Sequence, residues 1–196
     1  MLKAVLFDLN GLFITSRKLS EYFSEEYGIP AETFLPKLSE IMHQVRQPNA
    51  GPAFRHWEPV LKEWGLTLTE AEFWDFWFSK ESVSEDMVAL ARTLKKEGLK
   101  VLIISNNFKE RADFYGHYPW LHDAVDQVYF SFASGFVKPD MRAWAAPLAE
   151  HALAPSDCIY FDDQPKNIAA AESLGIESHL FESPAETERL IRLRLA

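Results

Sequence analysis

Polar side chains that could bind a metal ion and a phosphate group follow four short apolar runs of the sequence. The side chains concerned are Asp8, Asn10, Ser105, Asn106, Lys138, Asp162 and Asp163. The apolar runs are predicted to be strands, and the carboxyl ends of parallel strands meet at the edge of a sheet where ligands bind. A strand-end Asp alone is often a helix cap, a Ser-Asn pair is more often a turn, and a lone Lys-Pro is usually surface loop. Their joint occurrence, in order, favours one shared site.

The side-chain types indicate phosphoryl chemistry. Three clustered carboxylates, Asp8, Asp162 and Asp163, repel one another and favour a hard cation such as Mg²⁺, which takes oxygen ligands. The Lys138 ammonium and the Ser105 hydroxyl suit the oxygens of a phosphate. A carboxylate near the metal can attack phosphorus and become an aspartyl phosphate. The metal and the lysine would then neutralise the charge that develops on the transferred group.

The elements that must position these groups alternate between strands and helices. Strands are predicted at 3–9, 101–104, 128–130, 158–161 and 178–181. Helices are predicted at 84–97, 141–151, 165–174 and from about 185 onward, with a further helical stretch after 104. This alternation predicts an α/β fold built on a Rossmann-like, doubly wound parallel sheet.

A helical insertion is expected after the first strand. Helical patterns cover 19–27, 31–45, 53–64 and 69–80, with a Pro- and Gly-rich break at 47–52. Thr69 and Glu72 have the spacing of a capping box, which predicts the start of the fourth helix. We therefore expect a core of residues 1–14 and 82–196, with a small helical cap of residues 15–81.

The composition excludes several classes of protein. The 196 residues include 20 basic and 29 acidic side chains, for a net charge of −9, so nucleic acid and anionic membranes are not expected partners. The single cysteine, Cys158, excludes an intrachain disulfide or a cysteine zinc site. The sequence has neither an unbroken apolar run of about 18 residues nor a signal-peptide layout after Met1. A cytoplasmic protein, monomeric or homodimeric, is expected.

The sequence resembles the haloacid dehalogenase (HAD) superfamily, most of whose members are Mg²⁺-dependent phosphatases. The resemblance covers the whole chain and is strongest over 101–176, where the segments 161–168 and 171–176 are highly specific for the family. Within the superfamily the chain looks closest to the branch of the bacterial α-D-glucose-1-phosphate phosphatases and the N-terminal phosphatase domain of soluble epoxide hydrolase. The resemblance implies hydrolysis of a small phosphorylated metabolite, with a sugar phosphate as the expectation for that branch.

The resemblance also implies how a metal ion would be held. Asp8 would be the nucleophile, and its side chain and the backbone carbonyl of Asn10 would ligate Mg²⁺. Asp163 aligns with the direct metal ligand of the last motif. Asp162 would ligate the metal or orient its water, and Asn167 would support the two aspartates.

The phosphoryl group is assigned to the neighbouring segments in the same way. The resemblance implies that Ser105 and the backbone of Asn106 bind this group, together with Leu9 and Asn10. Lys138 would bridge the phosphate and Asp8. Asp8, Asn10 and Lys138 are thus the expected catalytic positions.

Asn10 departs from the pattern of the family. Typical members carry a second aspartate there, which protonates the leaving group, and loss of a general acid typically costs about 10²–10⁴-fold in rate. One hypothesis is a phosphatase that acts on good leaving groups, or that uses water or a cap residue as the acid. The alternatives are an impaired protein that binds metal or phosphate without useful turnover, and a 2-haloacid dehalogenase. The dehalogenases of the family have an aromatic residue at this position and use no metal.

The expected cap is rich in aromatic and basic residues. The segment 69–80 is apolar around most of its circumference, which indicates that other helices cover it; a substrate wall or a dimer face are the alternatives. His43, Arg46, Arg55 and His56 flank the break at 47–52 and are interpreted as surface residues or as substrate contacts. His43 or His56 could supply the missing proton, because histidine titrates in the useful range.

Overall fold

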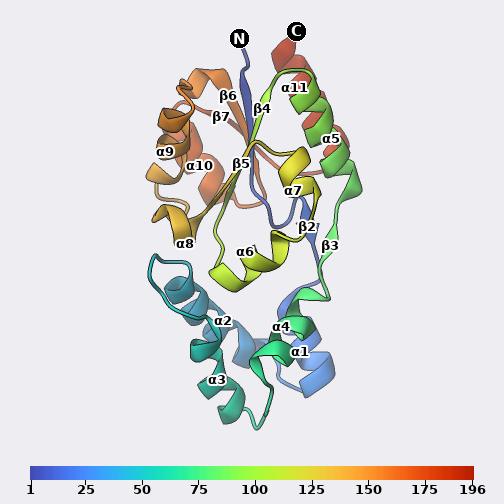
Figure 1. Cartoon of the computed structure of the whole chain (residues 1–196), viewed down its shortest axis with the longest axis vertical. Coiled ribbons are helices and arrows are strands. Elements are labelled where there is room, and N and C mark those ends of the chain that lie inside the picture. The colour runs from blue at the N-terminus through green and yellow to red at the C-terminus, as the bar shows by residue number, and fades with distance from the viewer.

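A five-stranded parallel sheet forms the centre of the molecule. The computed structural model describes residues 1–196 and orders the strands β5-β4-β1-β6-β7 (Figure 1). The strands are β1 (Ala4–Phe7), β4 (Lys100–Ser105), β5 (Gln127–Phe130), β6 (Cys158–Asp162) and β7 (Glu177–Leu180). All four strand pairings are parallel. The predicted doubly wound parallel sheet is therefore confirmed.

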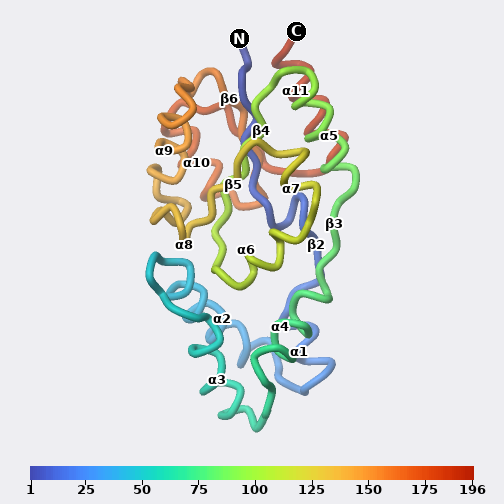
Figure 2. Tube along the Cα trace, in the orientation of Figure 1, coloured from blue at the N-terminus to red at the C-terminus, as the bar shows by residue number.

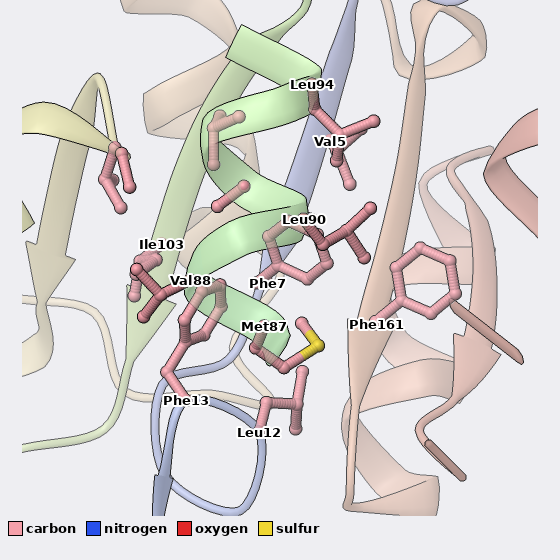
Figure 3. Close-up of a cluster of buried hydrophobic side chains, with 14 of the residues drawn as sticks. Val5, Phe7, Leu12, Phe13, Met87, Val88, Leu90, Leu94, Ile103 and Phe161 are labelled. Carbon is pink, nitrogen blue, oxygen red and sulfur yellow. The ribbon is translucent and has the colours of Figure 1, made fainter. Parts of the chain in front are cut away.

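Each face of the sheet has its own hydrophobic core, because successive strand residues point to opposite faces. Val5 and Phe7 belong to a core formed with α5 (Glu85–Lys96) and α11 (Pro184–Leu195), shown in Figure 3. Ala4 and Leu6 belong to the other core, formed with α9 (Arg142–Glu150) and α10 (Pro165–Ser173). This is why the central strands read as continuous apolar runs.

Strand register brings the polar strand-end residues to one edge. Phe7 of β1 lies opposite Ile103 of β4 and Phe161 of β6. Asp8 follows β1 directly, and Ser105 and Asp162 are the last residues of β4 and β6. The chain termini lie at the opposite end of the sheet (Figure 2).

Two short helices follow strands at this edge, α6 (Lys109–Tyr115) after β4 and α8 (Ser131–Ser134) after β5. The short helix α7 (Trp120–Asp123) leads into β5, and the 3-10 turn Pro155–Asp157 leads into β6 at the opposite edge. Strands β2 (Ile14–Thr15) and β3 (Ser82–Val83) pair antiparallel, a ribbon that the sequence did not predict. A two-residue strand is too short to show the alternation by which strands are recognised.

The chain leaves the sheet through β2 and returns through β3, with four helices between them (Figures 1 and 2). These are α1 (Leu19–Tyr27), α2 (Ala31–Val45), α3 (Phe54–Glu63) and α4 (Glu70–Phe78), which we call the four-helix segment. The predicted capping box is present at the start of α4, where Thr69 and Glu72 exchange hydrogen bonds.

Aromatic packing holds the four-helix segment together. Trp57 and Phe73 are fully buried, with their ring centroids 5.2 Å apart, in a core that the four helices share. The same core includes Phe108, whose ring lies 5.4 Å from Trp74 and 5.5 Å from Trp77. Because Phe108 follows β4, this aromatic packing also fixes the segment against the edge of the sheet. The boundaries of a separate cap, 15–81, stay a prediction.

Helices of this structure are too short or too polar to cross a lipid bilayer.

Candidate active site

Three carboxylates meet at the carboxyl edge of the sheet. One oxygen from each of Asp8, Asp162 and Asp163 lies within 4.8 Å of the others. Asp8 and Asp162 are buried, whereas Asp163 is exposed to the cavity above them. A triangle of carboxylate oxygens with one open side fits a hard divalent cation such as Mg²⁺.

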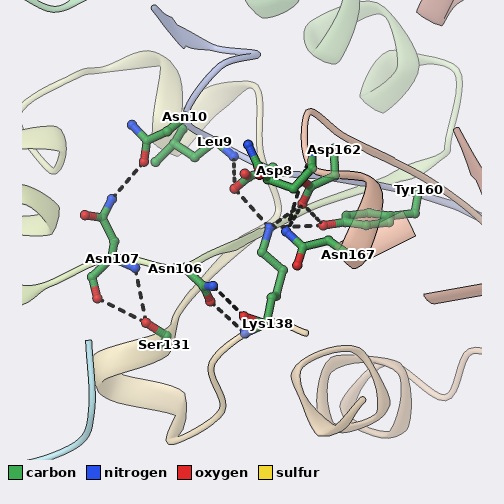
Figure 4. A network of polar contacts seen from close by, with 11 residues as sticks. Asp8, Leu9, Asn10, Asn106, Asn107, Ser131, Lys138, Tyr160, Asp162 and Asn167 are labelled. Carbon is green, nitrogen blue, oxygen red and sulfur yellow. Dashed lines mark hydrogen bonds and ion pairs between the residues drawn. The ribbon is translucent and has the colours of Figure 1, made fainter. Parts of the chain in front are cut away.

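Lys138 lies between two of these carboxylates (Figure 4). Its Nζ is 3.1 Å from Asp8 Oδ1 and 2.6 Å from Asp162 Oδ2, and it also donates to the Tyr160 hydroxyl at 3.0 Å. Asn106 fixes the backbone of this lysine, since its side chain accepts from the Lys138 N–H at 2.7 Å and donates to the Lys138 carbonyl at 2.8 Å. The segment after β4 thus holds the backbone of Lys138 through the Asn106 side chain, a contact that the sequence did not predict.

Asp162 is surrounded by donors from the protein. Besides Lys138, it accepts from the Tyr160 hydroxyl, from Asn167 Nδ2 at 3.0 and 3.1 Å, and from the Gln164 N–H at 2.8 Å. With both oxygens occupied and no exposed surface, Asp162 is suited to fix Lys138. Asp163 is the more accessible of the two, and partial burial raises its pKa.

Asp8 combines burial with an incomplete set of donors. Its Oδ1 accepts from the Leu9 N–H at 2.7 Å and faces Lys138. Burial raises the pKa of Asp8 to about 6; Lys138 lowers this pKa and Asp162 raises it. The Leu9 side chain lies in the hydrophobic core, so Leu9 reaches the site through its backbone only. A buried carboxylate that remains costly to ionise is suited to bind a cation.

The segment after β4 carries a buried hydroxyl without a partner. Ser105 Oγ is buried and makes no hydrogen bond within the protein. The next residues are fixed, because the Asn107 N–H donates to Ser131 Oγ at 3.1 Å and Ser131 Oγ donates to the Asn107 carbonyl at 3.1 Å. An unpaired hydroxyl beside a rigid segment is what an incoming phosphate oxygen requires.

Asn10 is held by residues that the sequence did not single out. Its Nδ2 donates to the Tyr115 hydroxyl at 2.8 Å, and Tyr115 donates to Glu81 Oε2 at 2.7 Å. Asn107 Nδ2 donates to Asn10 Oδ1 at 3.2 Å, and Arg111 forms an ion pair with Glu81. Asn107, Arg111 and Tyr115 follow one another at intervals of four residues, on and just before α6, whereas Glu81 comes from the segment before β3.

A polar cavity of about 290 Å³ opens over Asp8. Its lining contains no hydrophobic residue and consists of Asp8, Asn10, Arg46, Asn106, Arg111, Lys138, Asp163, Gln164, Lys166 and Asn167. Arg46 is the predicted basic candidate that reaches this cavity, and His43 lines an adjoining one. Arg55 and His56 line neither cavity.

Residues 2–175 match the family described as haloacid dehalogenase-like hydrolase. Among curated proteins, a sesquiterpene phosphatase of Aspergillus oryzae is 30% identical over 112 residues, which cover 55% of each protein. Acyl-CoA dehydrogenase family member 10 of Mus musculus is 24% identical over 199 residues, which cover 93% of this chain and 18% of that protein. The chain therefore spans less than two thirds of the length of either relative.

The fold is shared with solved structures of the same family. A HAD family enzyme of Bacteroides thetaiotaomicron, in complex with magnesium and inorganic phosphate, superposes with a TM-score of 0.78. The match covers 93% of this chain and 96% of that chain, at 19% sequence identity. At this level of identity the likeness shows a common fold.

Proposed function

Because the chain belongs to the haloacid dehalogenase-like hydrolases, as its sequence predicted, we propose that it is a Mg²⁺-dependent phosphatase of a small phosphomonoester. The observation that carries this proposal is the triangle of carboxylates at Asp8, Asp162 and Asp163, with Lys138 buried against two of them. The more specific likeness to the glucose-1-phosphate phosphatase branch stays a prediction.

We assign the metal to the open side of the carboxylate triangle. Asp8, Asp163 and the Asn10 carbonyl would hold Mg²⁺, and Asp162 would support the site through Lys138 and Asn167. When bound, the metal supplies positive charge that offsets the carboxylates and the phosphoryl oxygens. The geometry supports this assignment, because Asp163 is accessible while the donors around Asp162 come from the protein.

Asp8 would act as the nucleophile. Its oxygen attacks phosphorus while the bond from phosphorus to the alcohol oxygen breaks, and the departing alkoxide takes a proton from water. Hydrolysis of the aspartyl phosphate then releases inorganic phosphate and restores Asp8. Lys138 holds the attacking carboxylate in place, and the free Ser105 hydroxyl and the Asn106 backbone would bind the phosphoryl oxygens.

Asn10 supports a second candidate function. Its amide cannot protonate a leaving group. The protein would therefore be either a phosphatase that acts on good leaving groups or takes the proton from water or a cap residue, or a protein that binds metal and phosphate without useful turnover. The sesquiterpene phosphatase relative supports turnover of a phosphate ester of a sesquiterpene. The branch predicted from the sequence supports a sugar phosphate instead.

Hydrolysis of p-nitrophenyl phosphate tests the proposal, because its leaving group needs no acid. We expect turnover with Mg²⁺, none with EDTA, and a loss of at least about 10³-fold in Asp8→Asn. Asp75→Asn, at an exposed position of α4, is the matched control and should keep full activity. Full turnover by Asp8→Asn would exclude the mechanism. Calorimetric binding of Mg²⁺ and phosphate without any turnover would favour the second candidate.

A further inference from the structure

The Arg46 guanidinium faces the site without a partner from the protein. Arg46 follows α2 as its C-terminal capping residue and lines the cavity over Asp8. Its Nε is buried and makes no hydrogen bond, and burial lowers the pKa of this guanidinium. A half-buried cation without a counter-ion is costly, unless a ligand supplies the negative charge.

A second guanidinium lies in the wall of the same cavity. Arg111 forms an ion pair with Glu81 and lies over the rings of Trp77 and Tyr115, 5.8 and 5.5 Å from their centroids. Its Nε also lacks a hydrogen-bond partner. The charge of Arg111 further lowers the pKa of Arg46, whereas Asp8 raises it. Arg46 and Arg111 thus place two positive charges in the wall of one cavity, which favours an anion there.

The direction of attack decides which part of the substrate this site meets. In an in-line displacement the leaving group departs on the side of phosphorus away from the nucleophile. Asp8 lies at the edge of the sheet, and Arg46 comes from the four-helix segment beyond that edge (Figure 1). The leaving group therefore extends toward Arg46, while Lys138, Ser105 and Asn106 remain near the phosphoryl group.

The face of α2 that leads to Arg46 is otherwise apolar. Leu38, Met42 and Arg46 follow one another at intervals of four residues, so they lie on one face of the helix. All three line both cavities that flank the polar one. Arg46 is thus the charged residue at the end of this apolar row on α2, and a leaving group can bind along the row.

We propose that Arg46, with Arg111 beside it, binds a second anionic group on the leaving group of the substrate. The substrate class is therefore a phosphomonoester that carries a further carboxylate or phosphate. This proposal rests on the proposed phosphatase function and specifies its substrate.

Three substrates whose phosphate is esterified to a two-carbon chain test the proposal. Ethyl phosphate, 2-carboxyethyl phosphate and 1,2-ethanediol bisphosphate differ in having no second anion, a carboxylate or a phosphate. We expect kcat/KM to be at least about tenfold higher for one or both anionic substrates, and the stronger of the two identifies the anion. In Arg46→Gln this preference should fall to within about threefold, and Arg46→Lys should keep part of it. Arg55→Gln, an exposed arginine of the same segment, is the control that keeps it.

Binding of analogues separates this proposal from the phosphatase assignment. With Mg²⁺ present, 4-phosphonobutyrate should bind at least about tenfold more tightly than propylphosphonate by calorimetry, and Arg46→Gln should abolish the difference. Equal binding of the two analogues, or a preference that survives in Arg46→Gln, would overturn the anion site. A preference in binding without turnover of any substrate would keep the anion site and overturn the phosphatase.

Discussion

The Asn10 amide donates a 2.8 Å hydrogen bond to the hydroxyl of Tyr115, although the two residues lie 105 positions apart. Tyr115 has already donated its only proton to Glu81, so its oxygen can accept but not donate. The side chain at position 10 therefore faces the Tyr115 oxygen as an acceptor and must donate a hydrogen bond to it. An amide satisfies this requirement, and so does a protonated carboxylic acid.

Asn10→Asp should consequently act as a general acid. An ionised aspartate would face the Tyr115 oxygen and the nearby Glu81, so its pKa is expected to rise and the proton to be retained. We expect kcat/KM for ethyl phosphate to increase by about 10²-fold. For p-nitrophenyl phosphate, whose leaving group needs little assistance, the change should stay within about threefold. Equal gains with both substrates, or no gain with either, would show that a missing acid does not limit the rate.

Removal of Lys138 should destabilise the protein strongly. Lys138→Met leaves the Asp8 and Asp162 carboxylates buried without the cation that lies between them. Loss of one partner of a buried ion pair typically costs about 3–5 kcal/mol. Urea denaturation should report this loss, whereas Lys166→Met, at an exposed position, should change the free energy of unfolding by less than about 0.5 kcal/mol. A loss below about 1 kcal/mol for Lys138→Met would contradict the interpretation.

The sequence predicted the parts of the site that follow strands. Asp8, Ser105 and Asp162 each end or follow an apolar run, and parallel pairing brings such positions to one edge of the sheet. Lys138 follows a loop, but its order in the chain and its residue type were sufficient to propose it. These predictions depended on local pattern and on topology, both of which can be read from a sequence.

The remaining residues of the site could not be predicted in this way. Tyr160 lies within a buried strand and resembles a core residue, yet its hydroxyl accepts from Lys138. Arg111 and Tyr115 lie four residues apart on α6, and both contact Glu81, which precedes β3. Their spacing is that of one helix face, but the contact with Glu81 joins distant segments of the chain and arises from tertiary packing.

Asp8 should make the stability of the metal-free protein depend on pH. Its pKa is raised from 3.8 to about 6 by burial, so between about pH 4 and pH 6 the folded state binds a proton that the unfolded state has released. The contribution of Asp8 to the free energy of unfolding should therefore be greatest below about pH 4 and fall as the pH rises toward 6, by up to about 3 kcal/mol. Denaturation in EDTA should show this slope in the difference between the free energies of unfolding of the wild type and of Asp8→Asn. A slope of the opposite sign that Asp8→Asn abolishes would contradict the raised pKa.

Gly11→Ala should weaken metal binding by displacing Asp163. Gly11 has a φ of +92°, and a Cβ atom added there would lie 2.9 Å from Asp163 Oδ2, closer than such contacts allow. The accessible carboxylate must then move away from Asp8, and we expect the Kd for Mg²⁺ to rise about tenfold by calorimetry. Gly51→Ala separates this contact from backbone strain, because Gly51 has a φ of +75° but no atom within 4 Å of an added Cβ. Both variants should lose about 1 kcal/mol of stability from the left-handed backbone, while only Gly11→Ala should lose affinity for the metal. Equal Mg²⁺ affinity in the two variants would mean that Asp163 does not ligate the ion.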